Sequence, residues 1–133
     1  MGHFVNHVHL KSEDPGKTAE WFVAAFGLEI RGDTVREAGG DRFINCFDSK
    51  GFNINISGQR VNLGEKMEPA SAETRFGLEH FGFDVDDMDS EIERLKGLGA
   101  ELKDGPIEAG GGLKIAFISV PGPIRIELIQ RPS

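Results

Sequence analysis

Two histidines spaced two residues apart raise the question of what chemistry this sequence can do. They lie in "NHVHL", residues 6–10. Successive side chains of an extended chain point to opposite faces, so His7 and His9 share one face of a strand while Val8 and Leu10 share the other. A polar strand face usually meets water. The two histidines therefore gain a chemical role only if other strands supply partners.

Three further segments separate polar from apolar side chains in the same way. They are "GFNINIS" (51–57), "EHFGFDV" (79–85) and "GPIRIELI" (122–129), and they place Asn55, His80 and Glu127 on polar faces. If the apolar faces bury helices, the polar faces line one concavity that also holds His7 and His9. Two histidines and a carboxylate suit a divalent ion such as Fe(II), Mn, Ni, Co or Zn and leave positions open for water or substrate.

The helices and strands that must position these residues occur twice in the chain, as an internal repeat. Asp14 is expected to cap a helix that begins at Pro15 and ends at Gly27, with an apolar stripe of Ala19, Phe22, Val23 and Phe26. The second copy has the stripe Met88, Ile92, Leu95 and Leu98, with Gly97 and Gly99 as stop signals. Strands are expected after the helices at about 28–35, 42–48 and 52–57, and again at about 100–104, 113–120 and 123–130.

The repeated unit is therefore βαβββ, which predicts an α+β fold. Module one covers about 1–58 and module two about 76–133, both within a single domain of residues 1–133. The polar stretch at about 59–75 is rich in turn formers and reads as a connecting loop. The two modules are expected to form curved mixed sheets around a metal cavity.

Composition excludes several classes of partner. A net charge of −7 and a pI near 5.1 argue against nucleic acid and against an anionic membrane. The single cysteine, Cys46, excludes an intrachain disulfide and a multi-cysteine zinc site. The N-terminal stretch is too short and polar for a signal peptide and no apolar run could span a bilayer, so a cytoplasmic location is expected.

These segments resemble the vicinal oxygen chelate superfamily, which includes glyoxalase I, methylmalonyl-CoA epimerase, fosfomycin resistance proteins, extradiol dioxygenases and bleomycin resistance proteins. The resemblance covers nearly the whole chain. It implies that His7 and His80, each at the start of a module, and Glu127 in "RIEL" are metal ligands. Glyoxalase I and the epimerase carry Glu or Gln at a fourth ligand position, where this chain has Asn55.

The resemblance implies a metal-dependent, glyoxalase-like lyase or isomerase that acts on a small substrate with adjacent oxygens. The metal would act as a Lewis acid, and Glu127 or a metal-bound water would move the proton. His9 is open to three roles: general base, partner of a ligand, or polar lining. Lys11, Arg42 and Arg125 are candidates for an anionic substrate or are simply solvated. A homodimer is expected.

Two alternatives stay open. The His, His and Glu trio also resembles the facial triad of Fe(II) extradiol ring-cleavage dioxygenases. The chain contains no Tyr, which extradiol enzymes of the family commonly use. The second alternative is a metal-free drug-binding protein, as in bleomycin resistance, which the acidic balance suits. Retention of the three ligands favours the enzyme.

Overall fold

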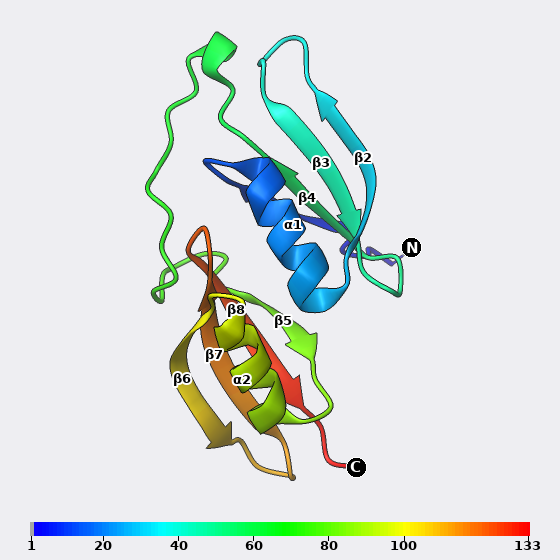
Figure 1. Cartoon of the computed structure of the whole chain (residues 1–133), viewed down its shortest axis with the longest axis vertical. Helices are drawn as coiled ribbons and strands as arrows, with labels where there is room; N and C mark the ends of the chain where they lie inside the picture. Colours follow the sequence, from blue (N-terminus) through cyan, green and yellow to red (C-terminus); the bar gives the residue numbers. More distant parts are fainter. Residues whose placement is uncertain (1) are drawn as a thin grey trace. The chain divides into compact units, whose positions relative to one another are not determined.

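The structure is a computed structural model that describes residues 2–133. The chain divides into two compact units, one ending at Glu68 and one spanning Pro69–Ser133 (Figure 1). The first contains β1 (His7–Lys11), α1 (Pro15–Phe26), β2 (Glu29–Val35), β3 (Arg42–Phe47), β4 (Asn53–Ser57) and the short 3-10 helix η1 (Val61–Leu63). The second contains β5 (Phe81–Asp84), α2 (Met88–Gly97), β6 (Glu101–Glu108), β7 (Lys114–Val120) and β8 (Ile124–Gln130). The predicted α+β fold of two βαβββ modules is confirmed.

Each unit builds one four-stranded mixed sheet. The order is β1-β4-β3-β2 in the first unit and β5-β8-β7-β6 in the second. The first strand of each module pairs in parallel with the last, β1 with β4 and β5 with β8, and the other pairs are antiparallel. The last strand of each module therefore lies beside the first, which brings residues far apart in the sequence into register.

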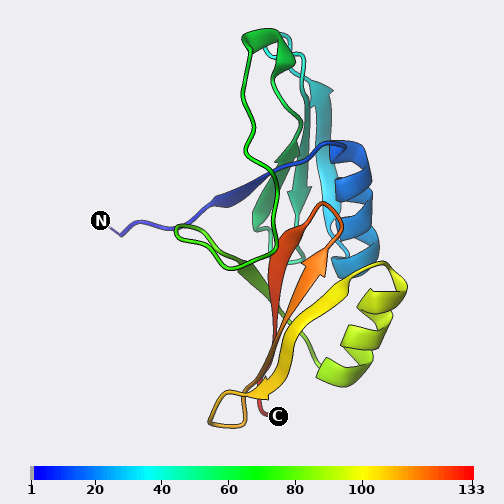
Figure 2. The ribbon, with the colours of Figure 1, turned by 90° about the vertical axis from the view of Figure 1, so that its left-hand side faces the viewer.

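The helix of each unit covers one face of its own sheet (Figure 2). In the first unit Phe22 of α1 is fully buried, as are Ile44 and Ile56 of the sheet. In the second unit Leu95 of α2 is buried with Leu128 of β8. Burial of large apolar side chains is the main favourable term in folding, so it fixes which sheet face is left for polar residues.

Helix α1 begins and ends where the sequence predicts. Asp14 accepts a hydrogen bond from the backbone N–H of Lys17 at 3.2 Å, and Pro15 follows as the first helical residue. At the other end Gly27 adopts φ of 68°, and its N–H donates to the carbonyl of Val23 at 3.0 Å. This left-handed conformation costs glycine nothing, which explains why the helix stops there.

Helix α2 departs from its predicted stripe at one residue. Met88, Ile92 and Leu95 are buried as expected, but Leu98 lies beyond the helix and is 37% exposed. The helix ends at Gly97, one residue before Leu98, so Leu98 does not continue the buried face. The backbone N–H of Met88 donates to Oε1 of Gln130 at 2.6 Å, so the last strand supplies a partner for the helix start.

Strand β6 is longer than predicted. The sequence predicts a strand over about 100–104, ending before Gly105 and Pro106, whereas β6 continues to Glu108. The register with β7 shifts between Leu102 and Asp104 and again between Asp104 and Ile107, after which pairing resumes. Such irregularities let a strand pass through residues that break regular pairing.

Among residues 2–133 the structure has no helix with the length and apolar character needed to cross a membrane.

Candidate functional site

The second unit brings together two of the three predicted metal ligands, His80 and Glu127. His80 immediately precedes β5, and Glu127 lies on β8 in register with Gly82. His80 Nε2 is 3.3 Å from Glu127 Oε1, and the two side chains are 31% and 18% exposed. The parallel pairing of β5 with β8 is what places these residues together, since they are far apart in the sequence.

The other nitrogen of His80 has a partner that sequence reasoning missed. His80 Nδ1 lies 3.1 Å from Oε1 of Glu79, the residue directly before it. The His80 ring also packs against the Phe117 ring in a T-shaped arrangement, with ring centroids 5.0 Å apart and planes at 78°. Glu79 was visible in the sequence, but strict alternation would have placed it on the opposite face from His80. Strand β5 begins only at Phe81, so the alternation does not hold here.

Arg125 completes this cluster from β8. Its side chain is 8% exposed, its guanidinium carbon lies 4.3 Å from the centre of the Phe117 ring, and Nε is 3.3 Å from Glu79 Oε1. Its Nη1 donates to the carbonyl oxygen of Ala72 at 3.3 Å. Arg125 is therefore packed inside the unit and faces Glu79, which sets it apart from a solvated cation.

The donors and acceptors around His80 do not balance without a cation. Ionised carboxylates only accept hydrogen bonds, so the contact with Glu79 requires the hydrogen on Nδ1. A neutral imidazole has a single N–H, which leaves a lone pair on Nε2 facing the Glu127 carboxylate. Two electron-rich atoms at 3.3 Å are held together favourably only when a positive charge, a proton or a metal ion, lies between them.

The separation of these two atoms fits a shared metal ion. Nitrogen and oxygen ligands bind a divalent transition ion at about 2.0–2.2 Å, so two neighbouring ligands of a tetrahedral or octahedral ion stand about 3.0–3.4 Å apart. The Nε2 to Oε1 distance of 3.3 Å lies in that range. Imidazole nitrogen and carboxylate oxygen are both donors that such ions accept. His80 and Glu127 therefore fit two positions of a metal site.

The first unit places His7 and His9 on the same strand with different surroundings. His7, at the start of β1, is exposed, and its Nδ1 donates to Oδ1 of Asn6 at 2.5 Å. His9 Nε2 is 2.7 Å from the hydroxyl of buried Ser57, and its ring meets the Phe43 ring edge-on at 5.4 Å. Partial burial, followed by the charges of Lys11 and Arg36, lowers the pKa of His9.

Asn55, at the possible fourth ligand position, is already engaged. Its Oδ1 accepts a hydrogen bond from Nδ2 of Asn45 at 2.8 Å, and both residues are in register across β3 and β4. Asn45 is a second residue that the sequence analysis did not single out. The alternation of β3 could have indicated that Asn45 lies on a polar face. The pairing of β3 with β4 then places Asn45 opposite Asn55.

Two of the three candidate cations for an anionic substrate are paired within the first unit. Lys11 Nζ contacts Glu65 Oε1 at 2.8 Å and donates to the carbonyl of Gly58 at 3.1 Å. Arg42 forms a two-pronged pair with Asp33, at 2.9 Å and 2.6 Å. With Arg125 buried against Glu79, none of the three is a simple solvated charge.

Among residues 2–133, no group of three or more His, Cys, Asp or Glu side chains is arranged to hold a metal ion. Glu79 and Glu127 contact opposite nitrogens of His80, so they do not converge on one point. The pairing of His80 with Glu127 is observed, and the addition of His7 remains a prediction.

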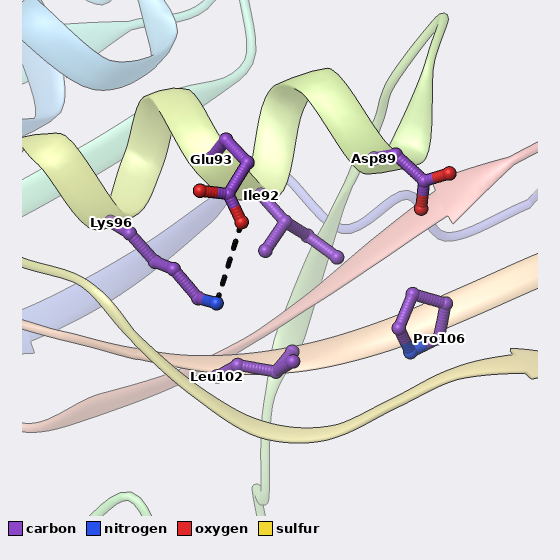
Figure 3. A pocket seen from close by; sticks show the side chains of 6 residues that line it. All are labelled: Asp89, Ile92, Glu93, Lys96, Leu102 and Pro106. Atoms are coloured by element: carbon purple, nitrogen blue, oxygen red, sulfur yellow. Dashed lines mark ion pairs between the residues drawn. The ribbon is translucent and has the colours of Figure 1, made fainter.

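A shallow groove of about 250 Å³ lies elsewhere in the second unit, between α2 and β6 (Figure 3). It is lined by Asp89, Ile92, Glu93, Lys96, Leu102 and Pro106. Two of its three charged lining residues, Glu93 and Lys96, are paired with each other at 3.5 Å. The groove holds none of the predicted site residues, so the His80 cluster is the stronger candidate site.

Comparison with known proteins agrees with the fold. The sequence profile of the Glyoxalase/Bleomycin resistance protein/Dioxygenase superfamily matches residues 6–117. The chain belongs to this superfamily.

Curated relatives include a putative lactoylglutathione lyase from Brassica oleracea var. gemmifera, 29% identical, and lactoylglutathione lyase GLX1 from Arabidopsis thaliana, 28% identical. Each match covers 94% of this chain and 43% of the relative, so the chain spans less than half the length of these proteins.

Solved structures share the fold. A glyoxalase family protein from Bacillus cereus superposes with a TM-score of 0.83 at 19% identity, covering 97% of this chain and 94% of that one. A point mutant of the fosfomycin resistance protein FosX from Listeria monocytogenes, in complex with Mn(II) and 1S,2S-dihydroxypropylphosphonic acid, superposes with a TM-score of 0.71 at 18% identity, covering 99% of this chain and 95% of that one.

Proposed function

We propose that this protein is a metal-dependent, glyoxalase-like enzyme, a lyase or isomerase, in which His7, His80 and Glu127 bind one divalent ion. The observation that carries the proposal is the 3.3 Å approach of His80 Nε2 to Glu127 Oε1, with the other nitrogen of His80 directed at Glu79. This arrangement favours a cation between the two atoms. The relatives named as lactoylglutathione lyases and the Mn(II) complex of FosX support the same reading.

His7 enters the proposal through the internal repeat. It stands in the first module where His80 stands in the second, at the start of the strand that pairs in parallel with the last strand of its own module. Its exposed imidazole is free of the burial that would restrict access to an ion. Metal sites with three protein ligands keep positions open for water or substrate.

The residues of the chain would divide the chemistry between them. A bound divalent ion supplies Lewis-acid stabilisation of a substrate that offers adjacent oxygens. Glu127 would take a proton from the substrate carbon and return it to the neighbouring position, as a positioned carboxylate can. His9, whose lowered pKa keeps it neutral near pH 7, would assist as a base or orient the substrate.

We also propose a homodimer, which sedimentation at micromolar concentration would test.

A metal and substrate screen tests the proposed reaction. Apo protein is reconstituted separately with Ni, Co, Mn, Zn and Fe(II), and each form is assayed with a hemithioacetal and with a catechol, with and without oxygen. The expected result is proton-transfer activity on the hemithioacetal or a related substrate with redox-inert ions, independent of oxygen. Oxygen uptake that requires both iron and catechol would establish the dioxygenase instead. Inactivity in both assays with tight binding of a cationic drug would establish sequestration.

Metal content tests the ligands separately from the reaction. His80→Ala and Glu127→Gln are expected to lose tight metal uptake while keeping the circular dichroism of the folded chain, because both side chains lie outside the apolar core. Glu108→Gln, which changes an exposed carboxylate of the same unit, is the matched control. Equal metal content in His80→Ala and in the wild type would refute the assignment.

A further inference from the structure

We propose that Glu79 is a positioning residue that fixes the hydrogen of His80 on Nδ1 and thereby presents Nε2 as the metal ligand, and that Arg125 holds Glu79 in place. The inference rests on the proposed metal-binding role of His80 and adds two residues that the family resemblance does not supply. The three residues come from two places in the sequence, Glu79 and His80 directly before β5 and Arg125 on β8, and they form one connected series of contacts.

A single oxygen of Glu79 carries both contacts. Oε1 lies 3.1 Å from His80 Nδ1 and 3.3 Å from Arg125 Nε. A carboxylate contacted on two sides by a hydrogen-bond donor and a cation has little freedom to rotate away from either. The hydrogen on Nδ1 is therefore stabilised by a charged acceptor, and such bonds are about twice as strong as those between neutral groups.

Arg125 is itself immobilised, so it can act as an anchor. Its side chain is 8% exposed, and it lies on the face of Phe117 with its guanidinium carbon 4.3 Å from the ring centre. Its Nε makes no hydrogen bond to any residue in 2–133 and has the Glu79 carboxylate as its charge partner. Removing Glu79 would leave a buried cation without compensation, which explains why the two occur together.

Phe117 contacts both His80 and Arg125, the two residues on either side of Glu79 in this series of contacts. The same ring that supports Arg125 makes a T-shaped contact with the His80 ring, with the two ring centroids 5.0 Å apart. Phe117 thus holds the position of the His80 ring, and Glu79 determines that the ring hydrogen lies on Nδ1. A metal-binding histidine commonly donates its second N–H to a carboxylate or carbonyl, which raises its basicity as a ligand and sets its orientation.

His7 offers an internal contrast. Its Nδ1 is bonded to the neutral amide oxygen of Asn6, and the residue is exposed at the start of β1. His80 has an anionic partner that is in turn held by a buried cation. The two proposed histidine ligands therefore differ in the charge of their hydrogen-bond partner, and His80 is expected to bind the metal ion more strongly than His7.

Nuclear magnetic resonance of the metal-free protein tests the hydrogen placement. Two-bond ¹H–¹⁵N correlations at pH 8.5, with His80→Ala to identify the signals, report which nitrogen of His80 carries the hydrogen. The wild type is expected to show the hydrogen mainly on Nδ1. In Glu79→Ala it is expected to move to Nε2, where Glu127 can accept it. Glu79→Gln, whose amide oxygen can still accept, is expected to restore the wild-type placement.

Metal affinity gives the second measurement. Glu79→Ala is expected to weaken binding of Zn(II) or Co(II) by about tenfold to a hundredfold, the usual effect of removing the partner of a metal-binding histidine. Glu79→Gln should fall between Glu79→Ala and the wild type. Glu108→Ala, the matched loss of an exposed carboxylate, should leave affinity unchanged. Arg125→Met, which keeps an apolar contact with Phe117, should weaken binding less than Glu79→Ala.

The outcomes separate this proposal from the proposed function. An unchanged hydrogen placement in Glu79→Ala, together with the affinity of the Glu108→Ala control, would overturn the role of Glu79 even if His80→Ala loses the metal. Full metal uptake by His80→Ala would overturn the metal site, while a shift of the hydrogen in Glu79→Ala would still support the positioning of His80. A folded Arg125→Met with wild-type affinity would remove Arg125 from the proposal.

Discussion

Asn55 on β4 and Glu127 on β8 occupy equivalent positions in the two sheets, each in register with the first strand of its own module. Their contacts differ. Asn55 Oδ1 accepts a hydrogen bond from Asn45 Nδ2 at 2.8 Å, whereas Glu127 Oε1 lies 3.3 Å from His80 Nε2. The repeated backbone thus presents a neutral amide in one module and a carboxylate in the other, which makes the second module the centre of the candidate site.

The family resemblance implies a fourth ligand position at Asn55, so replacing Asn55 with Glu is a test of that position and is expected to strengthen the proposed metal site. The substitution puts a carboxylate at the position equivalent to Glu127, and Asn45 can donate to a carboxylate as readily as to an amide. Because affinity rises with the charge of the oxygen ligands, we expect divalent metal binding to tighten by about tenfold. Competition with a chelator measures the change. Asn55→Gln has the same length without the charge, and a gain of equal size in Asn55→Gln would contradict the argument.

Much of the fold followed from local signals in the sequence. The cap at Asp14, the proline after it and Gly27 predict the limits of α1, because each satisfies or ends the backbone pattern of a helix directly. The extent of β6 could not be predicted in this way. Gly105 and Pro106 are local signals for a strand end, but pairing with β7 resumes beyond them. Pairing is a tertiary contact, and it prevailed over local preference.

The candidate site was only partly predictable for the same reason. Alternation along the strands and the repeat selected His80 and Glu127, which the structure places together. Glu79 was missed because alternation applies inside a strand, and β5 begins after His80. Arg125 was expected on the same polar face as Glu127, two residues further along β8, but its burial against Phe117 depends on the neighbouring strand β7.

The only thiol of the chain should report on the integrity of the first unit. Cys46 is fully buried on β3, and burial raises the pKa of its thiol from 9.0 to about 11. The thiolate is the reactive form, so the shift alone reduces reactivity toward a disulfide reagent at pH 8 by about a hundredfold, and exclusion of the reagent adds to this. Labelling of Cys46 at pH 8 in buffer is therefore expected to be at least about a hundredfold slower than labelling in urea. N-acetylcysteine serves as the reference for a fully exposed thiol. Similar rates in both would show that β3 is open to solvent.

Stability of the first unit should depend on pH through Glu65. Hydrogen bonds from Lys11, then from the backbone and side chain of Arg60, lower the pKa of Glu65 from 4.5 to about 2. Because the folded pKa is the lower one, the unfolded chain takes up the proton first. The stabilisation is present above about pH 4.5 and is lost as the pH falls toward 2.

Urea unfolding as a function of pH tests this assignment. Glu65→Gln is expected to be less stable than the wild type at pH 7, and the difference should shrink as the pH falls through that window. Glu37→Gln, an exposed carboxylate of the same unit, is the control. A difference between wild type and Glu65→Gln that stays constant from pH 7 to pH 2.5 would be incompatible with the ion pair as its source.

Gly82 sets how closely β5 approaches Glu127. The two residues are in register, and a Cβ added at Gly82 would lie 3.2 Å from the carbonyl oxygen of Glu127 and 3.5 Å from its Cβ. Gly82→Ala should therefore displace β5 from β8, separate His80 from Glu127 and weaken divalent metal binding by about tenfold, at the lower end of what changes beside a metal ligand cost.

Gly97→Ala adds the same methyl group at the end of α2, where a new Cβ would meet nothing within 4 Å. It should bind metal as the wild type does, because the added methyl group displaces nothing. Chelator competition on both variants, with circular dichroism to confirm folding, measures the difference. If Gly82→Ala kept wild-type affinity, the close approach of β5 to β8 would not be what brings His80 to Glu127. If both variants lost affinity equally, the loss would reflect the added methyl in general, and the space at Gly82 would have no special role.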